Sequence, residues 1–108
     1  MDIRFHEKLY KDEISDRKLS VLQKKIKKRK PKLNLFLVTL PLGSQGLLEV
    51  YWYPELLQSY YQNMDVSLMV VGIAKNREQA FEMVSRIVKD AGICEGHVPI
   101  NEFFKENT

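Results

Sequence analysis

Val66-Ser-Leu-Met-Val-Val-Gly-Ile-Ala74 is a nearly unbroken apolar run in the second half of the chain. A run without alternation is typical of a β-strand that is covered on both faces. Asn76 follows it and precedes Gln79 by three residues, a spacing in which each side chain can bond an unpaired backbone N–H at a helix start. The stretch therefore predicts a buried strand followed directly by a helix.

The helix after Asn76 has one apolar face and a clear end. Apolar residues recur at helical spacing at Ala80, Phe81, Val84, Ile87, Val88 and Ala91. Gly92 follows them, and glycine most easily adopts the left-handed conformation that ends a helix. An amphipathic helix in this position must fold back and bury its apolar face on a sheet.

Two more strands are predicted before this unit. Residues 33–40 form a second run that is apolar on both faces, and residues 47–53 alternate, with Leu48, Val50 and Trp52 on one side. The residues between them, Pro-Leu-Gly-Ser-Gln-Gly, are typical of a turn. So short a connection favours an antiparallel hairpin, because a parallel return needs a longer crossover.

Helices are predicted on either side of the hairpin. Over residues 16–29, Leu19, Leu22 and Ile26 form a narrow apolar stripe, and the proline at position 31 ends the helix. A second helix is predicted over residues 54–62, since proline suits the first helical position and apolar residues follow at helical spacing.

The first residues suggest a short opening strand, with Ile3 and Phe5 on one face and Arg4 and His6 on the other. With this strand, the order of elements corresponds to a ferredoxin-like split β-α-β arrangement with an extra C-terminal helix. Without it, the core is a three-stranded mixed sheet. In both cases we expect one α+β (α/β-like) domain over residues 1–108, with a single-layer mixed sheet of three to four strands packed with helices. Residues 93–108 would form a loosely packed tail.

The composition is ordinary for a soluble globular domain, with 44% apolar and 29% charged residues among 108. Cys94 is the one cysteine of the sequence, so it cannot form an internal disulfide. No apolar run approaches the roughly 20 residues that span a bilayer. The first residues also lack the basic start and apolar stretch of a secretory signal. We therefore expect a cytoplasmic protein.

The net charge of +3 conceals a strong asymmetry. One block holds seven cations within nine residues: Lys24, Lys25, Lys27, Lys28, Arg29, Lys30 and Lys32. The rest of the chain has 10 basic against 14 acidic residues, a net charge of −4. Clustered cations can contact the phosphates of a nucleic acid, but they also suit the negative end of a helix dipole and keep a protein in solution. Both interpretations stay open at this point.

Five aromatic residues lie within eleven positions: Tyr51, Trp52, Tyr53, Tyr60 and Tyr61. Because aromatic rings carry large burial energies, Trp52 and one tyrosine of each pair are expected in the core. The remaining tyrosines are candidates for an interaction surface or a subunit interface. Because the sequence does not show which tyrosine of each pair is buried, all four are candidate positions. Stacking on bases is the alternative, although the aromatic–glycine signature of an RNA-recognition strand is missing.

Residues 72–76 join the predicted central strand to its helix. Free N–H groups there, together with Lys75, Asn76 and Arg77, could hold an anion, while an ordinary helix cap explains the same residues. The sequence lacks the glycines and the Lys-Ser/Thr pair of a phosphate loop. Cys94 and His97 lie close together, but there is no second ligand pair for zinc and no recognisable nucleophile motif. We expect no metal, no cofactor and no catalytic residue.

These patterns favour a small non-enzymatic interaction or regulatory domain that self-associates or binds a protein partner. Its interaction surface would involve the tyrosines at 51, 53, 60 and 61. A small sheet with apolar positions on both faces also favours covering by a second copy. A nucleic-acid-binding protein that uses residues 24–32 is the alternative.

Overall fold

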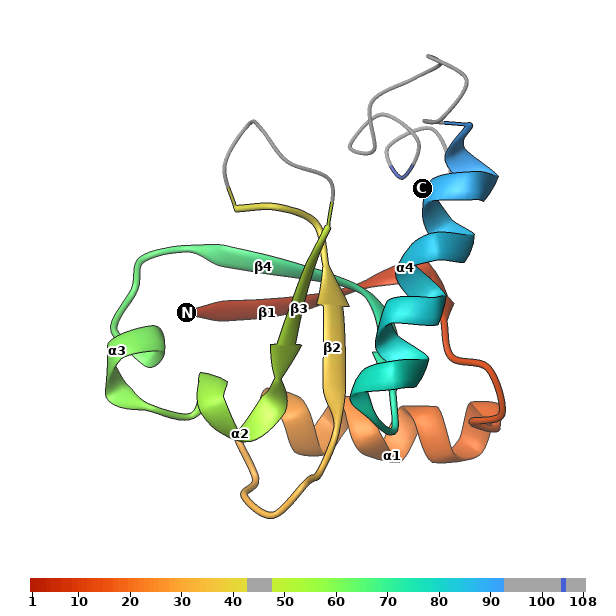
Figure 1. The fold of residues 1–108 in the computed structure, drawn as a ribbon. Helices are drawn as coiled ribbons and strands as arrows, with labels where there is room; N and C mark the ends of the chain where they lie inside the picture. The colour runs from red at the N-terminus through yellow and green to blue at the C-terminus, as the bar shows by residue number, and fades with distance from the viewer. Residues whose placement is uncertain (43–47, 93–103, 105–108) are drawn as a thin grey trace.

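The computed structural model describes residues 1–42, 48–92 and 104. Within these residues the chain forms four strands and four helices (Figure 1). In chain order they are β1 (Asp2–Tyr10), α1 (Asp16–Lys27), β2 (Phe36–Thr39), β3 (Glu49–Trp52), α2 (Tyr53–Leu56), α3 (Ser59–Gln62), β4 (Ser67–Ala74) and α4 (Arg77–Ala91). The opening strand is therefore present, and the sheet has the larger of the two expected strand numbers.

The four strands form one mixed sheet in the order β1-β4-β2-β3. β1 pairs in parallel with β4, and β2 runs antiparallel to both β4 and β3. β3 and β4 are thus parallel to each other with β2 between them, which is a split β-α-β unit joined by α2 and α3. The α+β class, the mixed sheet and the predicted hairpin pairing are confirmed, and the strand order now has β1 at one edge and β3 at the other.

β4 is the centre of the sheet, as its unbroken apolar sequence predicts. Every residue from Val70 to Ala74 is buried, and the strand pairs with a neighbour on each side. Gly72 makes room for the Met83 side chain, because a Cβ at this position would collide with Sδ of Met83 and lie 3.3 Å from Cβ of Val38. The glycine therefore allows α4 to pack closely against the sheet.

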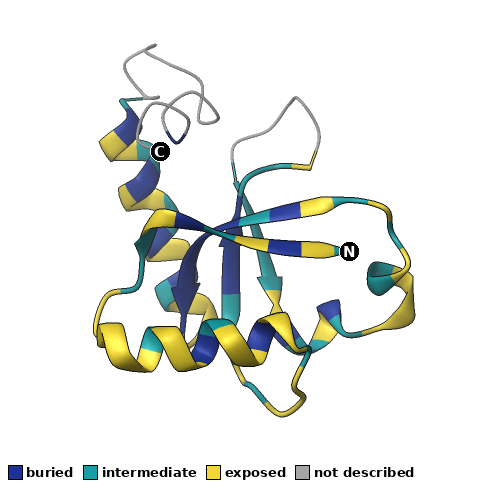
Figure 2. Cartoon of the chain, turned by 180° about the vertical axis from the view of Figure 1, so that it is seen from behind, coloured by how far each residue is buried: buried dark blue, intermediate teal, exposed yellow. Residues whose placement is uncertain are grey.

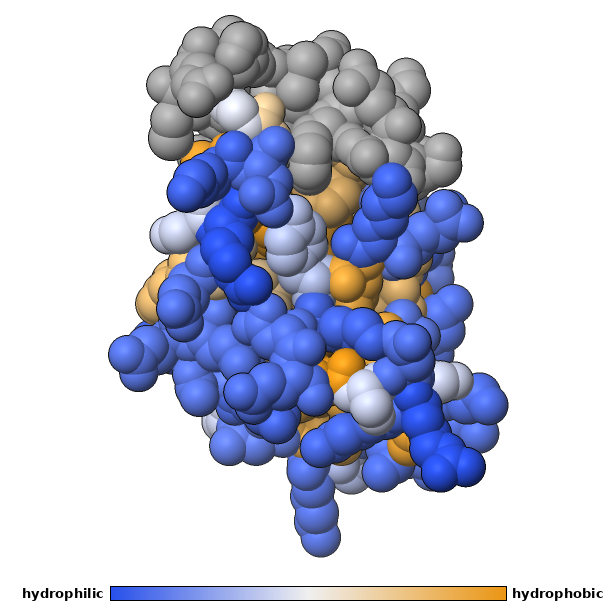
Figure 3. Space-filling model, turned by 90° about the vertical axis from the view of Figure 1, so that its right-hand side faces the viewer, coloured by the Kyte–Doolittle hydropathy of each residue, from blue (hydrophilic) through white to orange (hydrophobic). Residues whose placement is uncertain are grey.

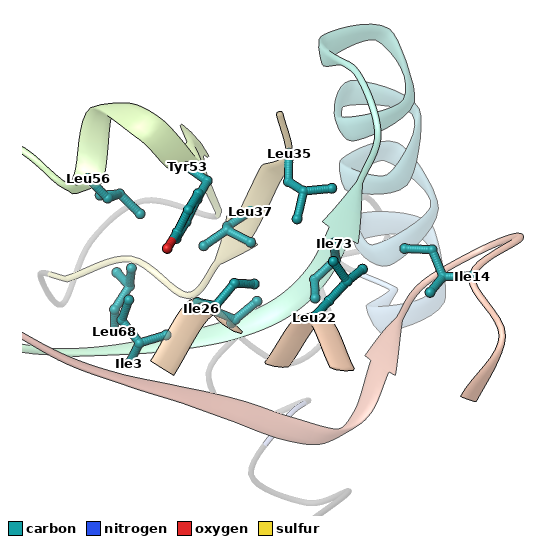
Figure 4. Packing of buried hydrophobic residues seen from close by; sticks show 11 residues of the cluster. Ile3, Ile14, Leu22, Ile26, Leu35, Leu37, Tyr53, Leu56, Leu68 and Ile73 are labelled. Carbon is teal, nitrogen blue, oxygen red and sulfur yellow. The ribbon is translucent and has the colours of Figure 1, made fainter. Parts of the chain in front are cut away.

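Helices cover both faces of the sheet. α1 and α2 lie on one face, where Leu22 and Ile26 of α1 meet Tyr53 and Leu56 of α2 over the strands (Figure 4). α4 lies on the other face and buries Ala80, Met83, Ile87 and Ala91 against β4 and β2. Seen from behind, α1 turns mostly exposed residues outward, away from the dark, buried strands (Figure 2).

The start and the end of α4 confirm the local signals in the sequence. The Asn76 side chain accepts a hydrogen bond of 2.7 Å from the N–H of Gln79. The Gln79 side chain in turn accepts one of 2.7 Å from the N–H of Lys75. Gly92 ends the helix with a φ of 70°. These caps satisfy backbone groups that would otherwise lack a partner within the helix.

Several predicted boundaries are wrong. The helix expected over residues 54–62 is two short helices, because Gln58 has an extended conformation before α3. Tyr53 and Leu56 are buried in α2, whereas α3 buries none of its residues fully and packs only the half-buried Tyr61 against the core. β2 and β3 are also shorter than expected, and Tyr53 begins a helix rather than ending a strand. Most of the predicted turn and tail (43–47, 93–103 and 105–108) lies outside the described residues.

His6 is buried although the sequence only placed it opposite Ile3. Its Nδ1 accepts a hydrogen bond of 3.0 Å from the N–H of Lys8, so Nε2 carries the proton and donates to the carbonyl oxygen of Phe104 at 2.9 Å. The Phe104 ring also meets the imidazole edge to face, with ring centres 4.9 Å apart. His6 therefore holds Phe104, the one described residue beyond Gly92, against the edge strand.

Candidate interaction surfaces

The structure separates the basic block into six exposed lysines and one arginine with a structural role. Lys24, Lys25 and Lys27 belong to the last turns of α1, and the other three lysines follow in the next five residues. None of the six ammonium groups has an ion pair or a hydrogen bond within the part of the chain that the structure describes. The block is thus a surface of uncompensated positive charge.

Arg29 instead joins three parts of the chain. Its guanidinium donates 2.9 Å to the side-chain oxygen of Gln62 and 2.6 Å to the carbonyl oxygen of Met1. It also donates to the carbonyl oxygens of Ile26 and Lys27, and it is only half-exposed. The backbone of Arg29 is left-handed, with a φ of 56°. Its guanidinium is therefore engaged in hydrogen bonds within the protein, and no pattern in the sequence separates Arg29 from its neighbours.

A hollow of about 520 Å³ lies beside the basic block, between α1 and the edge strand β1. Lys24 and Lys27 stand on its α1 side together with Ser20 and Gln23. The remaining lining residues are Phe5, His6, Glu7 and Leu19. The hollow thus combines two lysine amines, uncharged hydrogen-bonding groups, one carboxylate and an aromatic ring.

Three of the four candidate tyrosines form a cluster, and the fourth is in the core. The ring of Tyr61 meets those of Tyr51 and Tyr60 edge to face, with ring centres 6.1 and 5.1 Å away. Burial and a hydrogen bond to Glu49 raise the pKa of Tyr51, so this phenol stays protonated. Tyr60 is 72% exposed, whereas Tyr53 is completely buried and its hydroxyl donates to the carbonyl oxygen of Lys30 at 2.7 Å.

The sequence interpretation missed an apolar groove between β3 and α4. The groove encloses about 350 Å³, and most of its lining is apolar: Phe36, Leu48, Val50, Trp52, Phe81 and Val84. Trp52 and Phe81 were expected in the core, but they are 43% and 55% exposed. Both expectations were wrong because α4 packs mainly on β4 and β2 and leaves the face of β3 partly covered, with Leu48 and Val50 half-buried.

Two polar contacts fix the side chains at one end of this groove. The indole N–H of Trp52 donates to the side-chain oxygen of Asn34 at 3.0 Å. The guanidinium of Arg77 lies 5.7 Å from the ring centre of Phe36, which is within the range of a cation–π interaction. Glu55 also lines the groove, so its polar residues include one cation and one anion. Elsewhere on the α4 side the surface is mainly hydrophilic, with only small hydrophobic spots (Figure 3).

The start of α4 shows the features of a cap. The backbone N–H groups of Lys75 and Gln79 already bond side chains of the same turn, and the oxygen of Asn76 is used in one of these bonds. The side chain of Arg77 lies over Phe36. Two donors that an anion would need are therefore occupied.

Within residues 1–42, 48–92 and 104, no three His, Cys, Asp or Glu side chains come together as metal ligands would. Cys94 and His97 lie outside this part of the chain. None of the described helices is both long enough and apolar enough to cross a membrane.

Comparison with known proteins finds no matching family model, no similar curated protein and no similar solved structure. A functional proposal must therefore be argued from the surfaces themselves.

Proposed function

We propose that the chain is a small cytoplasmic, non-enzymatic interaction domain that self-associates through the edge of β3 and the groove beside it. The observation that carries this proposal is the position of the groove. Trp52 and Phe81 expose apolar surface directly beside a strand that pairs, among the described residues, only with β2. A free strand edge supplies unpaired backbone donors and acceptors, and a neighbouring apolar groove can receive side chains from the added strand.

The two sheet edges differ in the features that prevent edge-to-edge pairing. β1 has an irregular register between Phe5 and Tyr10, and charged side chains point out along it. β3 has a regular register and contains neither lysine nor proline. Its one charged residue, Glu49, accepts hydrogen bonds from the N–H of Leu42 and the hydroxyl of Tyr51. Edge pairing is therefore opposed by register and charge at β1, whereas β3 is protected mainly by its short length of four residues.

A second copy of the chain fits this surface well. In a two-fold dimer the same patch is used twice, so the patch must complement itself. The β3 groove holds one cation, Arg77, and one anion, Glu55, and its other lining residues are apolar. Antiparallel pairing of two β3 strands would join the two sheets and bring both grooves to the interface.

The test is the molar mass in solution, measured by sedimentation over a wide range of protein concentration. Wild-type protein is expected to form a dimer. Phe81→Glu is expected to lower the association constant at least about tenfold, because it places a charge in the apolar groove. Val21→Glu is the matched control, since Val21 is 47% exposed on α1 and lies outside the groove.

Tyr60→Glu tests whether the chains associate through the groove or through the tyrosine cluster. Tyr60 is the most exposed of the large hydrophobic residues, at 72%, and it does not line the groove. We expect this variant to dimerise like the wild type. A wild-type protein that stays monomeric at the highest concentration would contradict self-association, and loss of the dimer in Tyr60→Glu but not in Phe81→Glu would move the interface to the tyrosines.

A further inference from the structure

We infer that the end of α1 and the loop after it bind the phosphate backbone of a nucleic acid. This surface consists of the six exposed lysines: Lys24, Lys25, Lys27, Lys28, Lys30 and Lys32. Three other cations of the described chain are paired with carboxylates: Arg4 with Asp2, Lys11 with Asp16 and Arg86 with Asp12. The lysine surface has no such partner, so its charges are available to phosphates.

The backbone that carries these lysines is held in place from inside. The buried hydroxyl of Tyr53 donates to the carbonyl oxygen of Lys30, and Arg29 bonds Met1 and Gln62 beneath the same loop. Lys32 is left-handed, with a φ of 67° that is uncommon for a residue other than glycine. The loop therefore presents its lysines from a fixed backbone, which lowers the entropy that binding must remove.

The spacing of the lysines produces one extended surface. Lys24, Lys27 and Lys28 are three and four residues apart, so they share a side of α1. Lys30 and Lys32 follow in the exposed loop, and the N–H of Lys30 bonds the carbonyl oxygen of Lys25 at 3.0 Å, which keeps the start of the loop against the last turn of the helix. A row of cations of this kind can contact several phosphates of one strand at the same time.

The hollow beside Lys24 and Lys27 offers room for the part of a nucleotide that is not a phosphate. Ser20 and Gln23 supply hydrogen-bonding groups, and Phe5 supplies an aromatic ring. Glu7 on the opposite wall would repel a phosphate, so we place the phosphates at the lysines and a base or sugar in the hollow.

Lysines of this kind also attract an anionic membrane by charge, but this surface lacks the apolar face that anchors a helix in a membrane surface. A helix that binds a membrane surface inserts an apolar face between the lipids. In α1 that face is used by the fold, because Leu22 and Ile26 are buried against the sheet. Val21 is the one large apolar residue of α1 that is strongly exposed. A nucleic acid, which needs charge and hydrogen bonds, fits this surface better.

The experiment is a fluorescence-anisotropy titration of short labelled single-stranded RNA and duplex DNA, at several salt concentrations. The lysine-surface variant is Lys24→Gln/Lys27→Gln/Lys28→Gln. The control variant is Lys18→Gln/Lys75→Gln/Lys89→Gln, which removes the same charge from exposed positions outside the block. Both variants have the same net charge, so a difference between them reports the site and not the overall charge.

We expect wild type and control to bind at least one of the two nucleic acids with a strong dependence on salt. The lysine-surface variant should bind at least about tenfold more weakly at low salt, with a salt slope smaller by about 2–3, since each phosphate contact contributes about 0.7–0.9. Equal losses in the two variants, or no binding by the wild type at low salt, would overturn the inference.

Vesicles of equal parts phosphatidylcholine and phosphatidylserine provide the remaining comparison. Binding to these vesicles in the absence of nucleic-acid binding would assign the lysines to a membrane instead and reject the inference. The molar masses of the same variants show whether self-association is intact. A failure of the lysine surface is thereby distinguished from a failure of the β3 interface.

Discussion

The two faces of the sheet are covered to different extents, and the difference is clearest on β3. On the α1 face, α1 and α2 together form a closed layer over β2 and β4, in which Tyr53 and Leu56 are completely buried, and the hollow on this side lies beyond that layer, between α1 and β1. On the opposite face, α4 is the longest helix, yet it contacts β4 and β2 and leaves a groove over β3. Neighbouring residues of one strand therefore differ in role: Tyr51 belongs to the closed face, and Trp52 lines the groove.

The two faces should respond very differently to the loss of a large side chain. Leu37 is fully buried on the α1 face, whereas Phe81 is 55% exposed on the α4 face. Leu37→Ala is expected to lower the free energy of unfolding by about 2–5 kcal/mol, because it leaves a cavity in a closed layer. Phe81→Ala removes more atoms but should cost less than about 1 kcal/mol, since most of its ring is in water and alanine favours helix.

Urea unfolding of both variants at a low protein concentration provides the measurement, so that self-association does not add to stability. Similar losses in the two variants would mean that the α4 face is as closed as the other. The groove would then not exist in solution, and the proposed dimer interface would lose its basis.

The basic block offers a second comparison, between Arg29, which is hydrogen-bonded within the fold, and the exposed lysines around it. Arg29→Met removes the guanidinium bonds to Met1 and Gln62. We expect the free energy of unfolding to fall by about 1–3 kcal/mol, because partly buried oxygen atoms are left without donors. Lys28→Met changes the same charge at the adjacent, exposed position and should stay within about 0.5 kcal/mol of wild type.

Thermal unfolding of the two variants decides whether Arg29 belongs to the fold. A loss for Lys28→Met as large as that for Arg29→Met would assign both residues to the same structural role. The lysine surface would then not be a free surface, and variants in residues 24–32 could not separate binding from folding.

Local sequence patterns predicted most helices and strands of this protein, because the apolar spacing and the helix caps that form them depend on residues close together in the chain. The apolar run before Asn76 became β4, and the spacing from Asn76 to Gln79 became the cap of α4. The order of the strands could not be predicted, since β1 and β4 pair across more than sixty residues of chain. That pairing depends on long-range packing and not on a short motif.

The errors at the candidate surfaces have a common physical origin. Helical spacing shows which residues share a side of α4, but it does not show how much of that side the sheet covers. Phe81 is therefore on the apolar stripe and still exposed, while Met83, which the stripe omitted, is completely buried. In the same way, Arg29 is one more cation in the sequence, and only its contacts with Met1 and Gln62 separate it from the lysines.

The smallest expected effect concerns a polar atom in the otherwise apolar interior. Thr39 at the end of β2 is completely buried, and its hydroxyl oxygen has no hydrogen-bond partner within the described residues. The other buried polar residue, His6, has both ring nitrogens bonded. Thr39 therefore carries an uncompensated cost of removing a hydroxyl from water.

Thr39→Val keeps the shape of the side chain and replaces the hydroxyl by a methyl group. We expect the free energy of unfolding to rise by about 1 kcal/mol, measured as a higher urea midpoint with an unchanged slope. Thr39→Ser is the matched variant: it keeps the hydroxyl, loses the methyl group and should be less stable than wild type by about 1 kcal/mol. A loss of stability in Thr39→Val would show that this hydroxyl is bonded in solution and would contradict the prediction.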